Sequence, residues 1–93
     1  ALGEYARNVA ISSNKAVVGH MMGAASAFSA FATVKTIVEG IIPPTANLRN
    51  ADPQCDLDYV PLASRPADVR RALVNGFGFG GQNGSLAFQR FEG

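Results

Sequence analysis

The feature that most constrains the fold is a long stretch without formal charge, from Ala16 to Val34, if the lone histidine is neutral. Its composition predicts a helix over 21–39, because alanine is abundant, proline is absent, and Gly40 stands where a helix commonly ends. A surface helix has one apolar stripe and one charged face. Strongly apolar residues here point in several directions around the axis: Phe28, Phe31, Val34, Ile37 and Val38. We therefore expect a helix that is covered on all sides.

The other residues of this 93-residue chain can cover one side of such a helix but not every side. We therefore expect it to pack against more protein, supplied by upstream residues or by a partner subunit. A membrane span is the alternative, because about 20 residues are long enough to cross a bilayer. The stretch is rich in Gly, Ala, Ser and Thr and is only weakly hydrophobic, which favours a buried helix instead.

The rest of the chain predicts short strands and one long connection. Alternation at Val9 and Ile11 predicts a strand at 8–12, after the last turns of a helix at 1–7. Residues 41–66 hold all five prolines and predict an ordered connection with little regular structure. The remaining expected elements are one helical turn at 66–70 and strands at 71–75 and 85–91, joined as an antiparallel pair by a glycine-rich turn.

Composition excludes several classes of function. The net charge is +1, from 8 basic and 7 acidic residues, which argues against nucleic acid or an anionic membrane as the main partner. One cysteine and one histidine exclude a disulfide framework and a Cys-rich or His-rich metal centre. The first residues do not have the pattern of a secretory leader, but the chain begins with Ala1 rather than Met, so this carries no conclusion about residues upstream.

Cys55 and His20 invite the hypothesis of a nucleophile pair. Cys55 stands among three aspartates, which disfavour the thiolate, and we interpret it as a half-buried loop cysteine. His20 lies between a polar turn and the start of the apolar helix, where the helix dipole disfavours the imidazolium ion. A neutral ring there can donate one N–H to a developing oxyanion, or it can be a core histidine with its hydrogen bonds satisfied.

The segment from Gly76 to Gly84 is rich in glycine and contains two phenylalanines. A phosphate loop or a dinucleotide fingerprint is excluded, because no Gly-Lys-Ser/Thr follows and a strand comes next rather than a helix. Glycines allow positive φ and close backbone approach, which suits an active-site loop. We expect one of Phe77 and Phe79 to anchor in the core and the other to line a cavity.

Five segments together resemble the C-terminal end of β-ketoacyl-[acyl-carrier-protein] synthases, the condensing enzymes of fatty-acid and polyketide synthesis. They follow one another in the family's order: Ser12-Ser13-Asn14-Lys15, Gly19-His20-Met21-Met22-Gly23-Ala24-Ala25, Ile42-Pro43-Pro44-Thr45-Ala46-Asn47-Leu48, Asp56-Leu57-Asp58-Tyr59-Val60-Pro61 and Asn75-Gly76-Phe77-Gly78-Phe79-Gly80-Gly81-Gln82-Asn83. The resemblance implies an α/β chain, a fragment of the thiolase fold, which is a five-layered αβαβα sandwich. Residues 1–93 would supply a strand, the buried helix, the long loop and an antiparallel strand pair.

The implied activity is a decarboxylating Claisen condensation of malonyl carrier protein with an enzyme-bound acyl thioester. By the resemblance, His20 is the second catalytic histidine, and Lys15 is a nearby family lysine. Phe79 would be the acyl gate and an oxyanion-hole donor, in a gating loop that contains Gly78, Gly80 and Gly81. The nucleophilic cysteine would lie upstream of this chain, and the fragment alone would be inactive. The resemblance also implies acyl carrier protein as partner, a cytoplasmic homodimer, and no cofactor or metal.

Three positions depart from the family pattern. Ser29 replaces a glutamate that pairs with the family lysine, so Lys15 lacks that partner, and Ser26 replaces a small glycine. Gln82 is a milder change within the glycine-rich segment. Two alternatives to an active condensing enzyme therefore stand: a non-catalytic ketosynthase-like subunit that shapes an acyl tunnel, and a free-standing small domain.

Overall fold

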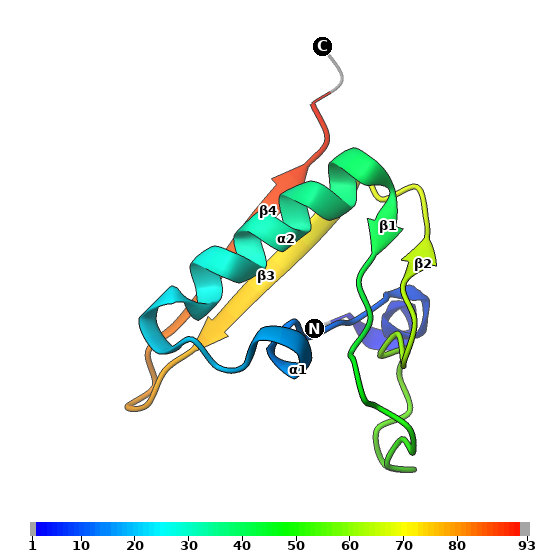
Figure 1. Cartoon of the computed structure of the whole chain (residues 1–93), viewed down its shortest axis with the longest axis horizontal. Helices are drawn as coiled ribbons and strands as arrows, with labels where there is room; N and C mark the ends of the chain where they lie inside the picture. The colour runs from blue at the N-terminus through cyan, green and yellow to red at the C-terminus, as the bar shows by residue number, and fades with distance from the viewer. Residues whose placement is uncertain (1, 92–93) are drawn as a thin grey trace.

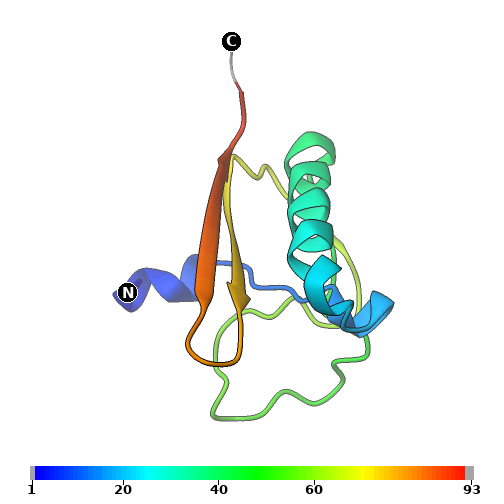
Figure 2. The same ribbon diagram turned by 90° about the vertical axis from the view of Figure 1, so that its left-hand side faces the viewer.

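The computed structural model describes residues 2–91, in which a helix lies against one face of a two-stranded hairpin (Figures 1 and 2). In chain order the elements are η1 (Gly3–Asn8), α1 (Lys15–Val18), η2 (Met22–Ala24), α2 (Ala25–Glu39), β1 (Ile41–Ile42), β2 (Arg65–Pro66), β3 (Arg71–Phe77) and β4 (Asn83–Gln89), where η marks a 3-10 helix. The strands form two separate antiparallel pairs, β1 with β2 and β3 with β4.

The predicted central helix is confirmed, with a 3-10 turn at its start. η2 leads into α2, and Gly40 ends the helix in the left-handed conformation at φ 69° and ψ 33°. The Gly40 N–H donates to the carbonyl of Thr36 at 2.9 Å, which satisfies one of the last helical carbonyls. Lys35 and Glu39 form an ion pair of 2.7 Å one turn apart.

The predicted antiparallel strand pair is also confirmed, and its register runs from Arg71 opposite Gln89 to Phe77 opposite Asn83. Side chains alternate between the two faces of the pair. Val74 points to the face covered by α2 and is buried, whereas Leu73 and Phe77 point to the other face and are exposed. The expectation that Phe77 or Phe79 anchors in the core is wrong for this chain, because no described residue covers that face or the turn.

Helix α2 is covered on one side only by the described residues. Ile37 is its one buried residue there, whereas Phe31 and Val38 are 61% and 74% exposed. The core of residues 2–91 consists of Ile37, Val60 and Val74. This confirms the prediction that the other residues of the chain cover one side of the helix but not every side. Within residues 2–91, no helix is long and apolar enough to cross a membrane.

Three local predictions are wrong. Residues 8–12 form no strand, because only Ala10 makes a bridge, to Asp58. Residues 66–70 form no helical turn, since Pro66 pairs with Ile41 in the β1–β2 ladder. The short helix α1 was not predicted, because four residues are too few to show a helical period in the sequence. Its N-cap residue, Asn14, makes no side-chain capping hydrogen bond either.

Asp58 organises the long connection between β1 and β2. Its carboxylate accepts two hydrogen bonds from the Arg65 guanidinium, at 2.6 and 2.8 Å, and one from the Val60 N–H at 3.1 Å. Its carbonyl accepts from the Ile11 N–H at 2.8 Å. The side-chain hydrogen bond from Arg65, followed by that from the Val60 backbone, lowers the pKa of Asp58 from 3.8 to about 2.

We expect Asp58→Asn to destabilise the protein at pH 7 by on the order of 1 kcal/mol, because a bidentate charged pair is lost while the amide can still accept from Val60. The folded-state pKa is depressed, so the stabilisation is complete above about pH 4 and is lost as pH falls toward 2. Urea unfolding between pH 2 and 7 measures both effects. Asp56→Asn is the control, because its pair with Arg7 is well exposed; equal losses in the two variants would contradict this prediction.

Candidate functional site

The segment that carries Lys15 is held against the proline-rich connection. Residues 12–16 and 43–47 lie about thirty positions apart in sequence and are joined by three hydrogen bonds. These are Ser12 Oγ to the Pro43 carbonyl at 2.7 Å, the Ser13 N–H to Thr45 Oγ1 at 3.3 Å, and Asn47 Nδ2 to the Ala16 carbonyl at 3.4 Å. Two of the segments that carry the family resemblance therefore lie side by side and fix where α1 begins.

His20 lies on the connector between α1 and η2, and left-handed residues stand close on either side of it. Gly19 has φ 76° and ψ 176°, a region of the backbone map that essentially only glycine occupies. Met22 has φ 51°, which is uncommon for a residue with a side chain. The sequence reasoning singled out His20 but missed the role of Gly19, whose only signal was a glycine directly before the histidine.

A hydrogen bond from the backbone fixes how His20 can act. The Met22 N–H donates to His20 Nδ1 at 3.0 Å, so Nδ1 carries a lone pair rather than a proton. The neutral tautomer assigned by this bond has its proton on Nε2. The ring is exposed in this chain, so Nε2–H is free to donate to a bound group.

The glycine-rich segment forms the turn between β3 and β4. The Gly78 N–H donates to the Gln82 carbonyl at 2.6 Å and closes a five-residue loop. Gly80 and Gly81 have φ of 83° and 82°, which a residue with a side chain rarely adopts. Phe79 lies at the tip with its side chain fully exposed. Among residues 2–91, the Phe79 ring therefore projects away from the strands.

The His20 connector and the Phe79 turn lie at the same end of the molecule. Helix α2 runs antiparallel to β3, so the start of the helix lies beside the end of the strand (Figures 1 and 2). Ser26, in the first turn of α2, approaches Gly76, the penultimate residue of β3. The structure therefore brings the predicted histidine and the predicted gating loop to one edge.

Lys15 is the first residue of α1, and it is exposed. Within residues 2–91 it forms no ion pair, and Ser29 offers it no carboxylate.

Cys55 is exposed rather than half-buried, so that interpretation is wrong. The residue follows a turn in which its N–H donates to the Asp52 carbonyl at 2.8 Å, and this turn leaves the thiol outside. Cys55 lines a cavity of about 400 Å³ together with Ser12, Ser13 and Tyr59, and His20 is not part of that cavity. No group of potential metal ligands occurs among the described residues.

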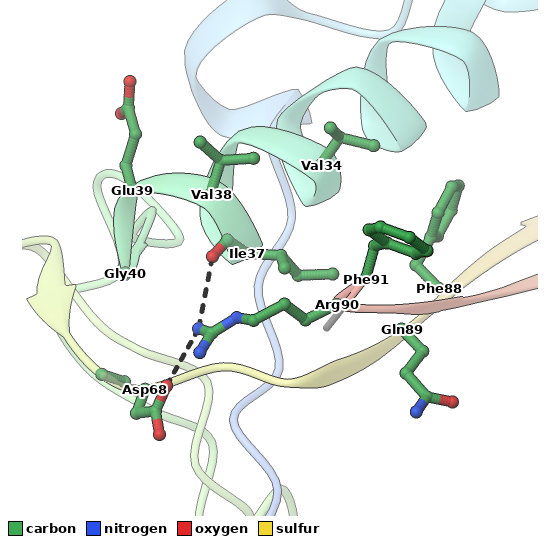
Figure 3. A pocket seen from close by; sticks show the side chains of 11 residues that line it. Val34, Ile37, Val38, Glu39, Gly40, Asp68, Phe88, Gln89, Arg90 and Phe91 are labelled. Carbon is green, nitrogen blue, oxygen red and sulfur yellow. Dashed lines mark hydrogen bonds and ion pairs between the residues drawn. The ribbon is translucent and has the colours of Figure 1, made fainter. Parts of the chain in front are cut away.

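A larger cavity, of about 570 Å³, lies at the other end of α2 and contains none of the predicted site residues (Figure 3). Arg90 crosses it, donating to the carbonyls of Ile37 at 3.4 Å and Val69 at 3.0 Å and pairing with Asp68 at 2.9 Å. Hydrogen bonds from Arg90 and then Arg70 lower the pKa of Asp68. This cluster ties the C-terminal end of α2 to β4 and is structural.

Solved structures with the same fold are ketosynthases. The chain superposes with a TM-score of 0.94 on a chain of a type II polyketide synthase acyl-carrier protein in complex with its ketosynthase, at 33% identity over 98% of this chain and 22% of that one. The ishigamide ketosynthase/chain length factor matches with a TM-score of 0.84 and 44% identity, over 86% and 20% of the two chains. The chain thus has the α/β architecture of this part of the thiolase fold, as expected.

The sequence comparisons give the family. The family described as "Beta-ketoacyl synthase, C-terminal domain" matches residues 1–49. The chain is 52% identical to 3-oxoacyl-[acyl-carrier-protein] synthase 2 of Synechocystis over 99% of its length, and 47% identical to actinorhodin polyketide putative beta-ketoacyl synthase 1 of Streptomyces coelicolor, also over 99%. It spans 22% and 20% of those two relatives. This chain belongs to the beta-ketoacyl synthase family.

We expect Gly19→Ala to lower the stability of the protein by about 1–3 kcal/mol, because alanine is strained at this backbone conformation although no neighbour would touch its Cβ. Gly23→Ala is the matched control, with the same open space and no positive φ. Thermal unfolding of both variants measures the difference, and equal melting temperatures would show that the Gly19 conformation carries no strain.

Proposed function

We propose that this chain is the C-terminal part of a 3-oxoacyl-[acyl-carrier-protein] synthase. The enzyme would condense malonyl-carrier protein with an enzyme-bound acyl thioester in fatty-acid or polyketide synthesis. The observation that carries this proposal is the hydrogen bond from the Met22 N–H to His20 Nδ1, at 3.0 Å, which leaves Nε2–H as a donor. Identities of 52% and 47% to two named synthases support it.

His20 acts at the decarboxylation step. The malonyl thioester loses carbon dioxide, and the electron pair of the broken C–C bond moves into an enolate whose negative charge lies on the thioester oxygen. The Nε2–H of His20 donates to that oxygen and stabilises the charge as it forms. The enolate carbon then attacks the acyl thioester of a cysteine outside this chain, a new C–C bond forms, and the thiolate leaves.

Phe79 controls access of the acyl chain to this site. Its exposed ring and the neighbouring glycines Gly78, Gly80 and Gly81, whose backbone changes conformation at little steric cost, suit a gate that opens for acyl transfer and closes for condensation. The backbone N–H of Phe79 contributes to the oxyanion hole for the acyl thioester. Lys15 supports the site electrostatically from the start of α1.

The partner that follows from this chemistry is acyl carrier protein, which delivers both thioesters. One similar solved structure holds a ketosynthase with its acyl-carrier protein, which supports the same partner here. The complete enzyme is proposed to be a cytoplasmic homodimer that needs no cofactor.

A second candidate is a non-catalytic ketosynthase-like subunit that shapes the acyl tunnel of a heterodimer. Ser29, in place of the family glutamate that pairs with the lysine, favours it. Mass spectrometry of the full-length protein after incubation with acyl-carrier protein distinguishes the two, because only the enzyme acquires an acyl group on its own cysteine.

We expect His20→Ala in the full-length protein to slow malonyl decarboxylation by about 10²–10³-fold, because one oxyanion donor is lost. Acylation of the nucleophilic cysteine should stay within a few-fold of wild type. His20→Gln, whose amide can still donate, should recover part of the rate. Radiolabelled carbon dioxide release measures decarboxylation, and an unchanged rate in His20→Ala would remove His20 from the mechanism.

We expect Phe79→Ala in the full-length protein to alter the rate of acyl transfer by roughly tenfold, because the ring controls access of the acyl chain. Gln82→Ala, in the same turn, is the control. Single-turnover acylation followed by mass spectrometry gives the rate, and identical rates for Phe79→Ala and Gln82→Ala would exclude the gate.

A further inference from the structure

Gly76 lies near the end of β3, where the first turn of α2 packs on that strand. A Cβ placed on Gly76 would lie 2.6 Å from Ser26 Oγ and 3.7 Å from Ser26 Cβ. The first distance is far shorter than a carbon–oxygen contact allows, and the second is ordinary van der Waals contact. Ser26 therefore occupies the space that a side chain at residue 76 would need.

The cross-strand neighbour of Gly76 shows that this constraint is local. Gly84 pairs directly with Gly76 and so faces the same side of the hairpin. A Cβ on Gly84 would meet nothing within 4 Å. The helix thus crosses over β3 at Gly76 and leaves the equivalent position on β4 open.

The position of this contact in the sequence links it to the site. Ser26 is the second residue of α2, six residues after His20. Gly76 is three residues before Phe79. A change in the α2–β3 separation here would move the His20 connector relative to the Phe79 turn.

We infer that Gly76 is a positioning residue: its missing side chain lets Ser26 seat α2 on β3, and this contact sets the separation between the His20 imidazole and the Phe79 turn. The inference rests on the proposed function, because it concerns the geometry of that same site. Gly76 and Ser26 touch no substrate in this scheme and act only through the two elements that they join.

The test is a double-mutant cycle in the full-length synthase. Gly76→Ala should lower kcat for condensation by about tenfold with KM changed less than about twofold, because misplacement by a fraction of an ångström impairs the reaction more than binding. Ser26→Ala alone should stay near wild type, since its Cβ remains in place. In Gly76→Ala/Ser26→Ala the short contact is absent, and kcat should return to within about threefold of wild type.

Two further variants test whether the effect comes from the contact between residue 76 and Ser26. Gly84→Ala is the matched control and should be neutral. Gly76→Val should lower kcat further than Gly76→Ala, because the γ-carbons of the valine also reach Ser26 Cβ. For the same reason, adding Ser26→Ala should restore less of the kcat of Gly76→Val than of Gly76→Ala. Rotation of the Ser26 hydroxyl is the one local escape for Gly76→Ala, and wild-type kcat in that variant would show that it occurs and would overturn the inference. A double variant as slow as Gly76→Ala also overturns it.

Crystal structures separate this inference from the proposed function. The distance from His20 Nε2 to the Phe79 backbone nitrogen should change in Gly76→Ala and return in the double variant, whether or not the protein condenses acyl groups. An inactive wild-type protein would defeat the proposed function while the structures still decide the inference. An unchanged distance in Gly76→Ala would overturn the inference even in an active enzyme.

Discussion

The pairing of Asp58 with Arg65 holds together the part of the chain that regular structure does not. Most of the connection between β1 and β2 has no helix or strand, and only isolated bridges and side-chain bonds can order it. Asp58 bonds Arg65 and Val60 with its carboxylate and Ile11 with its carbonyl, so one residue joins three segments. Val60, the most buried residue described, is held by this arrangement at a positive φ of 47°.

Hydrogen bonding also holds an irregular segment in place around His20. Gly19 and Met22 both have a positive φ; at Met22, which has a side chain, this conformation is costly and persists only where the surroundings impose it. The hydrogen bond between the Met22 N–H and His20 Nδ1 is one such influence, and it orients the imidazole at the same time. The backbone strain and the proton position therefore arise from one local structure, as is common at functional sites.

The sequence predicted the elements whose signals are local. Helix α2 follows from alanine content and from the glycine at 40, and the hairpin follows from alternation on both sides of a glycine-rich turn. The strand at 8–12 failed because alternation shows the propensity to pair and not the partner. The core position expected for a turn phenylalanine failed because this chain holds nothing that covers Phe77.

For the site, residue identity was predictable and geometry was not. His20 and Phe79 could be named from their motifs, whereas the proton position on the imidazole depends on a backbone N–H two residues away. The fit between Ser26 and Gly76 joins residues fifty positions apart and appears only when α2 is placed on β3. Such long-range contacts leave no periodic trace in a single sequence.

Arg90 anchors the C-terminal end of α2. By bonding the Ile37 carbonyl at 3.4 Å and the Val69 carbonyl at 3.0 Å, it anchors the last turn of the helix to the hairpin and to Asp68. A helix of 15 residues is about 22 Å long, so a tilt of about 3° about that anchor moves its first turn by about 1 Å. Such a tilt would displace η2, and the connector before it that carries the His20 imidazole, relative to the hairpin.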